Sequence, residues 1–185
     1  MHWYWIVAIA IGAVIVLLAA WRLTFRAGRL DRLHRRMDAA WVSLDQALNQ
    51  RVEIAERVAQ AELPDPASAS AIKDSLELER TVADSDFDTR CIAESRVTRE
   101  LADAFADEGC VADVNDRLGS TGLMDELNSV TRRVEMTRRF YNDAVRATVA
   151  VREQRMVRWF HLAGHTPWPH YFDMADSPPA GFGIR

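Results

Sequence analysis

The side chains with the clearest chemical potential lie close to the C-terminus. His161 and His165 are four residues apart, and His170 and Asp173 follow them. Two imidazoles at this spacing lie on one face of a helix and could bind a metal ion. No glutamate completes an HExxH pattern, however, and Gly164 falls where the helix is expected to end. Imidazoles near anionic headgroups explain the same residues, so we expect neither a metal site nor a cofactor.

Tyr141 and Asn142 form a second candidate, because both are polar residues on or beside an apolar helical stripe. The ring of Tyr141 can be buried while its hydroxyl group finds a hydrogen-bond partner. Asn142 could bind Asp45 or Arg51 on an earlier helix and so fix the register of the two helices. We expect a structural role for this pair, with ligand binding as the alternative.

Sequence signatures of the common enzyme classes are absent from the chain. It has no GxSxG, P-loop, GxGxxG, kinase or HExxH pattern. The acidic residues between 62 and 116 are expected to form a solvated surface rather than a pair of catalytic carboxylates. Cys91 and Cys110 lack CxxC spacing and are expected to be free thiols. We therefore predict that the protein is not an enzyme.

The N-terminal residues predict a membrane anchor. No charged residue occurs from Trp3 to Trp21, and about 20 apolar residues suffice to cross a bilayer as a helix. Tryptophan and tyrosine at the two ends suit the level of the headgroups. A cleaved secretory signal is the alternative, but it normally has a basic start and a shorter apolar core. We predict an uncleaved single-pass anchor over residues 1–22.

Arginines after this segment predict its orientation. Basic flanks stay on the cytoplasmic side of a membrane, so we expect the N-terminus outside and residues 23–185 in the cytoplasm. Anionic lipid would attract the basic and aromatic residues near the membrane. These lipid-interface candidates are Arg22, Arg26, Arg29, Arg152, Arg155, Arg158, Trp159 and Trp168. The aromatic members could equally cap the core of the protein.

Apolar residues recur at steps of three and four along most of the remaining chain, which is typical of amphipathic helices. The expected helices run over 29–62, from Ser68 or Ser70 to 84, over 89–107 and from 124 to about 160, with a loop over 109–122. The first is expected to be continuous with the anchor and to end at Pro64 and Pro66, since proline cannot donate to the helical ladder.

These lengths predict an all-α protein. After the transmembrane helix, two long and two shorter helices are expected to form an up-and-down antiparallel four-helix bundle. The bundle should occupy residues 23–165, followed by an irregular tail over 166–185 that is rich in aromatic residues, proline and glycine. We expect a head formed by the acidic region, and a narrower basic stem at the membrane.

Three local patterns, together with the anchor, resemble the LemA family of bacterial membrane proteins. They are Ala39-Ala40-Trp41 with Asp45, Glu135 followed by RRFYNDAV over 138–145, and GHTPWPHYF over 164–172. The resemblance covers nearly the whole chain and marks a divergent member, since Thr148-Val149 stands where many members repeat Tyr-Asn. It implies a single N-terminal span, a cytoplasmic long-helix bundle and no established biochemical activity. The motif residues are Trp41, Asp45, Glu135, Arg138, Tyr141 and Asn142.

A scaffold or adaptor at the inner face of the membrane is the function that these features favour. The expected partners are the anionic bilayer, further copies of the chain, and other membrane or cytoplasmic proteins. The acidic head argues against nucleic acid as a partner. Two alternatives remain: a sensor that passes a membrane or envelope signal through the continuous first helix, and an exported helical domain after signal cleavage.

Overall fold

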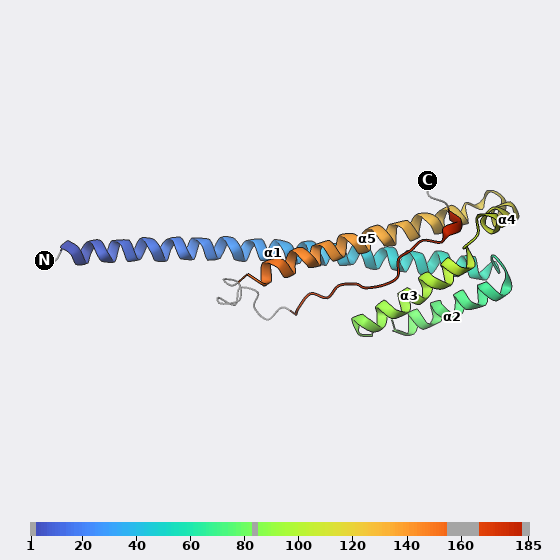
Figure 1. Cartoon of the computed structure of the whole chain (residues 1–185), viewed down its shortest axis with the longest axis horizontal. Coiled ribbons are helices and arrows are strands. Elements are labelled where there is room, and N and C mark those ends of the chain that lie inside the picture. The colour runs from blue at the N-terminus through green and yellow to red at the C-terminus, as the bar shows by residue number, and fades with distance from the viewer. Residues whose placement is uncertain (1–2, 83–84, 155–166, 183–185) are drawn as a thin grey trace. The chain divides into compact units, whose positions relative to one another are not determined.

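The computed structural model describes residues 3–82, 85–154 and 167–182, without the side chains at 8, 19–20, 23–27, 30 and 120. Within these ranges all regular structure is helical, so the all-α class is confirmed (Figure 1). The elements are α1 (Trp3–Gln60), α2 (Pro66–Val82), α3 (Phe87–Ala104), α4 (Glu108–Leu118), the 3-10 helix η1 (Gly119–Thr121), α5 (Leu123–Arg152) and the 3-10 helix η2 (Ala180–Phe182).

Helix α1 runs without interruption from Trp3 to Gln60, so the expected continuity between the N-terminal segment and the first long helix is confirmed. When only the described residues are counted, no helix is both long enough and apolar enough to cross a bilayer. The side chains at positions 8, 19 and 20 of α1 are not among the described ones.

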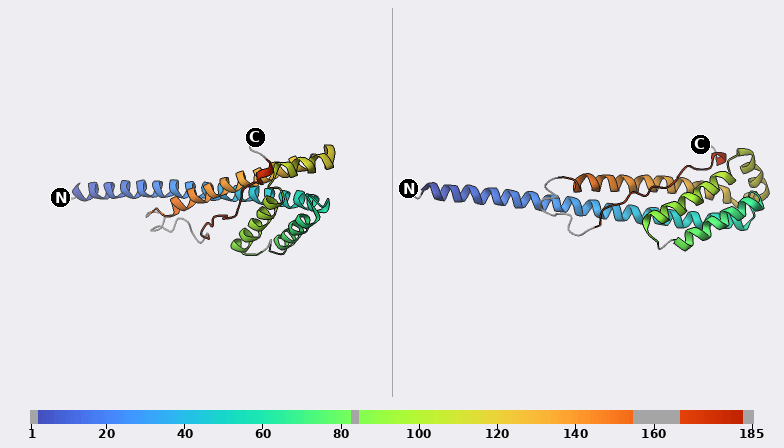
Figure 2. Two further views of the ribbon diagram at one scale, coloured as in Figure 1. Left: turned by 45° about the vertical axis from the view of Figure 1, so that its right-hand side comes forward. Right: turned by 60° about the horizontal axis from the view of Figure 1, so that its bottom comes forward.

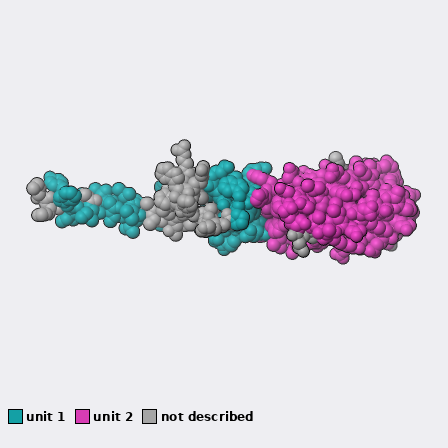
Figure 3. Space-filling model, turned by 90° about the horizontal axis from the view of Figure 1, so that it is seen from below, with its two compact units in different colours: residues 1–38, 144–169 teal, residues 39–143, 170–185 magenta. Residues whose placement is uncertain are grey.

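The chain divides into two compact units (Figure 3). Unit 1 comprises residues 1–38 and 144–169, and unit 2 comprises residues 39–143 and 170–185. Within unit 2, residues 39–60 of α1, then α2, α3 and residues 123–143 of α5 run in alternating directions (Figure 2). Helices α2 and α3 lie side by side. Unit 2 therefore has the up-and-down order that the helix lengths favoured.

Hydrogen bonds at its C-terminal end stop α1 before the prolines. Glu62 adopts a left-handed conformation with a φ of 56°, and its N–H donates to the carbonyl of Ala59 at 3.2 Å. The N–H of Leu63 donates to the carbonyl of Val58 at 3.3 Å. This pair of bonds is the Schellman motif, which commonly includes an apolar contact between the two outer residues. Leu63 and Val58 are indeed both buried in the core of unit 2.

Helix α2 begins earlier than the sequence pattern indicated. The carboxylate of Asp65 accepts hydrogen bonds from the backbone of Ala67 at 2.9 Å and of Ser68 at 3.1 Å. It also accepts one from the Ser68 hydroxyl at 2.7 Å. Asp65 is thus the N-cap, and the expected start at Ser68 or Ser70 is wrong. Pro66 is tolerated in the first turn because its missing N–H would have no helical partner there.

The loop expected over 109–122 is also wrong, because most of it is helix α4. The carboxylate of Asp107 caps this helix by accepting a hydrogen bond from the N–H of Cys110 at 3.1 Å. Val111 and Val114, three residues apart, are the buried side chains of α4. These two valines and the partly buried Leu118 pack α4 against the core, so unit 2 contains a helix that the four-helix expectation lacked.

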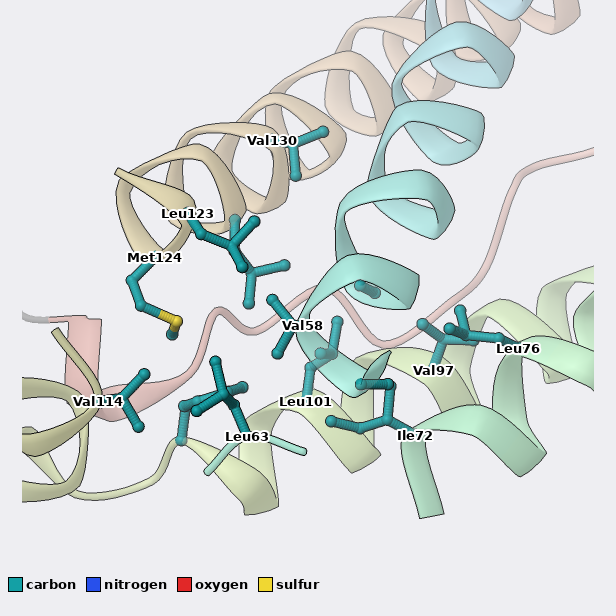
Figure 4. Packing of buried hydrophobic residues seen from close by; sticks show 14 of the residues in the cluster. Val58, Leu63, Ile72, Leu76, Val97, Leu101, Val114, Leu123, Met124 and Val130 are labelled. Carbon is teal, nitrogen blue, oxygen red and sulfur yellow. The ribbon is translucent and has the colours of Figure 1, made fainter. Parts of the chain in front are cut away.

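The core of unit 2 lies where its helices converge (Figure 4). Every α-helix of the unit contributes to it, through residues such as Val58 of α1, Ile72 of α2, Leu101 of α3, Val114 of α4 and Leu127 of α5. Complete burial of a side chain of this size contributes about 1.5–3 kcal/mol. Among the partly buried hydrophobic residues that pack against this cluster, Phe182 comes from the C-terminal part of the chain.

Candidate functional site

Most of the motif residues gather around the C-terminal segment 170–182, which we name the tail. The tail runs along the helices of unit 2 without helical structure until η2 (Figure 1). Phe172 is fully buried, with its ring centroid 5.2 Å from that of Phe87 and 5.6 Å from that of Trp41. Trp41 also lies 5.4 Å from the ring of Tyr141. The two contacts of Phe172 are edge-to-face, and such contacts are each worth about 0.5–1.5 kcal/mol beyond the buried area.

Asn142 holds the tail by its backbone. Its side-chain oxygen accepts a hydrogen bond from the N–H of Phe172 at 2.9 Å, and its side-chain nitrogen donates to the carbonyl of the same residue at 3.1 Å. The expected partners Asp45 and Arg51 were therefore wrong. The expectation for Tyr141 is confirmed, because its ring is buried and its hydroxyl donates to the carbonyl of His170 at 2.9 Å.

Two further contacts continue along the tail. Arg138 donates from Nε at 3.0 Å and from Nη2 at 2.5 Å to one carboxylate oxygen of Asp176. Both side chains are about one-fifth exposed, so the ion pair is partly shielded from water. The N–H of Ala175 donates to the hydroxyl of Ser95 on α3 at 3.0 Å. The motif arginine on α5 therefore binds the tail.

The tail ends in a close backbone approach. Gly181 donates from its N–H to the carbonyl of Phe105 at 3.0 Å. A Cβ atom at this position would lie 2.5 Å from that carbonyl oxygen and 2.7 Å from the carbonyl oxygen of Asp107, so the site requires glycine. Phe182 stacks on the ring of Phe105 with centroids 5.9 Å apart.

The two carboxylates of the motif set, Asp45 and Glu135, make no hydrogen bond to the tail among the described contacts. Asp45 accepts a hydrogen bond from Arg90 of α3 at 2.6 Å, and the Arg90 guanidinium lies over the Trp41 ring, 5.4 Å from its centroid. Asp45 therefore holds Arg90 over the Trp41 ring, and Phe172 packs against that same ring. Glu135 instead pairs with Arg139 one turn along the surface of α5.

A buried group of charges between α1, α2 and α3 was not recognised in the sequence. Arg51 and Glu94 are almost inaccessible to solvent, and Arg51 Nη2 donates to Glu94 Oε2 at 2.5 Å. Arg51 Nη1 donates to the hydroxyl of Thr98 at 2.7 Å. The signal was available, since Glu94 and Thr98 share a helical face with the apolar residue Leu101.

Glu79 corrects the expectation of an entirely solvated acidic surface. Its side chain is only 4 % exposed. Burial raises the pKa of the Glu79 carboxyl group, and the negative charge of Glu94 adds to this, while Arg90 and Arg51 oppose it. The remaining described acidic residues of α2, α3 and α4 outside this group are mostly exposed, including Asp74, Glu77, Asp88, Asp103, Glu108 and Asp113.

The lipid-interface candidates fall into different environments. Arg22 and Arg29 are exposed on α1, whereas the side chain of Arg26 and all of Arg155, Arg158 and Trp159 lie outside the described residues. Arg152 is buried and is therefore a correction to this set. It donates to the carbonyl of Pro167 at 2.6 Å and lies over the ring of Trp168, 4.9 Å from its centroid. Trp168 itself is half-exposed.

The histidines and cysteines do not gather into a metal-binding cluster in the described part of the chain. His161 and His165 lie outside it, and within it no three potential metal ligands come together. Cys91 and Cys110 are free thiols, as expected. Burial raises the pKa of the Cys91 thiol to about 11, which keeps it protonated and weakly nucleophilic at neutral pH.

Comparison with known proteins adds no family: no family model, curated protein or solved structure matches this chain.

Proposed function

We propose that this protein is a divergent LemA-like scaffold or adaptor, anchored by one transmembrane helix at the inner face of the bacterial membrane. The observation that carries the proposal is the start of α1, where large apolar side chains are exposed and no charge occurs from 3 to 21. Trp3, Ile9 and Leu17 are 70 %, 70 % and 68 % exposed. Apolar surface in water costs about 25 cal/mol per Å², whereas hydrocarbon solvates it.

The arginines that follow support the proposed orientation. Arg22 and Arg29 are exposed on α1, directly after the uncharged segment. Such residues favour the cytoplasmic side and gain about 1 kcal/mol each near anionic headgroups. The resemblance to the LemA family supports the same arrangement.

Exposed surface on unit 2 supports a role in binding proteins. On α5, Met136 is 56 % and Phe140 is 60 % exposed. They border a shallow hollow of about 450 Å³ with charged neighbours, lined by Arg132, Glu135, Met136, Arg139, Phe140 and Asp143. An apolar centre with a charged rim is typical of protein contact surfaces. The acidic surface of α2 and α3 is a second region that a basic partner would recognise.

Cysteine labelling in intact cells tests the topology. We would replace Cys91 and Cys110 with serine and introduce Ser177→Cys, since Ser177 is exposed and Gly181 has no space for a side chain. A membrane-impermeant maleimide should label this cysteine only after the membrane is opened. Labelling of unbroken cells would place unit 2 outside and favour the exported alternative.

The continuity of α1 supports a second candidate, a sensor that transmits a change at the membrane through the helix. Inserting two alanines after Gly28 would rotate the following part of α1 by about 200°, whereas inserting seven would nearly restore its phase. In a sensor, the two-residue insertion should change which proteins crosslink to unit 2, and the seven-residue insertion should not. A scaffold should keep the same crosslinked partners in both variants.

A further inference from the structure

We propose that the groove holding the tail is a recognition site for an extended peptide that carries an aromatic residue four positions before an aspartate. The tail groove is formed by Trp41, Phe87, Ser95, Arg138, Tyr141 and Asn142. In this view the chain's own tail competes with such a segment of a partner protein. The proposal rests on the adaptor function above and adds the chemistry of the partner.

Backbone recognition makes the groove suitable for segments other than the tail. The Asn142 amide binds both the N–H and the carbonyl of Phe172, as an adjacent β-strand would. The hydroxyl groups of Tyr141 and Ser95 bind the backbone of His170 and Ala175. None of these hydrogen bonds depends on the side chains of the tail, so an extended segment of different sequence can make them.

Two side chains of the tail supply the specificity. Phe172 packs against both the Phe87 and the Trp41 ring, whose centroids lie 5.3 Å apart, and is fully buried. Asp176 accepts two hydrogen bonds from Arg138 in a partly shielded ion pair. A peptide therefore needs an aromatic side chain and, four residues later, a carboxylate to occupy the groove as the tail does.

Burial along the tail follows the pattern of a bound strand. Phe172 and Met174 are buried. Asp173, which lies between them, and Ala175, which follows them, are exposed. This alternation is that of an extended segment with one face in a groove. The core cluster of unit 2 is built mainly by helices, and the tail reaches it only near its end, where Gly181 donates to the carbonyl of Phe105 and Phe182 packs against the cluster. Helices with their own core can hold a groove that one segment leaves and another enters.

The test uses the full-length chain in detergent and a fluorescein-labelled peptide with the sequence of residues 170–182. The tail-side variant Phe172→Ala/Asp176→Ala weakens the chain's own tail but leaves every groove residue intact. The groove-side variant adds Asn142→Ala on the same background. Fluorescence anisotropy measures the apparent affinity of each chain for the peptide, and circular dichroism checks its helical content.

We expect the tail-side variant to bind the peptide at least about 10-fold more tightly than the wild type, because a site that is seldom vacant has a reduced apparent affinity. The groove-side variant should lose binding, and so should a peptide with alanine in place of the phenylalanine. The proposal is overturned if the tail-side variant does not bind, if all chains bind equally, or if this variant loses its helical signal. The last result would make the tail a permanent part of the fold. Since no arm depends on membrane orientation, these failures are separate from failure of the labelling experiment.

Discussion

Arg51 and Glu94 form an ion pair that is almost completely removed from water. Transferring each charge from water into the protein costs several kcal/mol, and only good geometry with further hydrogen bonds offsets that cost. Thr98 provides one such bond, but Arg51 Nε and Glu94 Oε1 have no partner in the described part of the chain. We infer that the pair fixes the register of α1 against α3 more than it adds stability.

Removing one partner of this pair should therefore be costly. Arg51→Met leaves the Glu94 carboxylate buried beside Glu79, and we expect the free energy of unfolding to fall by about 3–5 kcal/mol. The double variant Arg51→Met/Glu94→Leu should recover much of this loss, because no buried charge is left unpaired. Urea unfolding followed by circular dichroism measures both.

Arg57, which pairs with Glu126 at 2.7 Å with both side chains about half-exposed, is the matched control. Arg57→Met should cost less than about 1 kcal/mol, since exposed pairs contribute little. A double variant no more stable than Arg51→Met would show that the unpaired carboxylate is not the source of the loss.

Glu79 should make stability depend on pH. Because burial raises its pKa in the folded state, folding favours the protonated form, and stability falls as the pH rises from the unfolded pKa through the folded pKa. Glu79→Gln removes this penalty, so we expect its Tm to exceed that of the wild type by up to a few degrees at pH 8. The difference should shrink towards pH 5. Thermal melts between pH 5 and pH 8 measure this Tm difference, and Glu77→Gln, at an exposed position of α2, is the control. Equal Tm shifts in both variants would contradict the raised pKa of Glu79.

For single residues, Tyr141 and Asn142 show what can and what cannot be predicted from the sequence. Helical phase predicts that the Tyr141 ring is buried and that its hydroxyl needs a partner. Phase alone does not identify which distant segment provides the partner for Asn142. The tail residue Phe172 lies 30 positions away with no helical pattern to place it, so a helix-to-helix contact was the nearest available interpretation.

At the level of elements, the turns and caps decide where each helix begins. Gly109 was interpreted as part of a loop, yet it lies in the first turn of α4. A Cβ at Gly109 would lie 2.9 Å from the Asp107 carboxylate that caps the helix. A glycine that normally indicates a loop here makes room for a capping side chain. Long stripes such as those of α1 and α5 are predictable, whereas an eleven-residue helix with two buried valines gives too short a pattern.

The Asp107 cap leads to a prediction at this scale. Asp107→Ala removes the acceptor for the Cys110 N–H, and loss of an N-cap costs about 0.5–2 kcal/mol. We expect a lower Tm and faster hydrogen exchange confined to α4. Asp103→Ala, which removes an exposed carboxylate from α3, is the matched control. Equal exchange in α4 for both variants would show that the cap does not hold the helix.

At the level of the whole molecule, the residues that stabilise unit 2 are separate from those that we propose to place in the membrane. The core cluster of unit 2 begins at Val52 of α1, well beyond the uncharged segment. The all-α class follows from apolar periodicity, and the continuity of α1 follows from the absence of proline before Pro64. The division into two units cannot be predicted from this periodicity, because it depends on which helical faces pack together. A change in the first residues should therefore alter where the protein resides without melting unit 2.

Two valines on the same helix allow this separation to be tested. Val14 is 55 % exposed and Val42 is 53 % exposed, so an arginine at either position meets similar surroundings in the structure. If residues 3–21 cross the bilayer, Val14→Arg places a charge near its centre at a cost of about 2.5–3.5 kcal/mol. We then expect Val14→Arg to move a large share of the chain from the carbonate-resistant membrane fraction to the supernatant. Val42→Arg should leave the distribution unchanged, and both variants should keep the Tm of unit 2. Equal fractionation of the two variants would mean that α1 does not insert, and the exposed apolar residues of α1 would then require a protein partner instead of lipid.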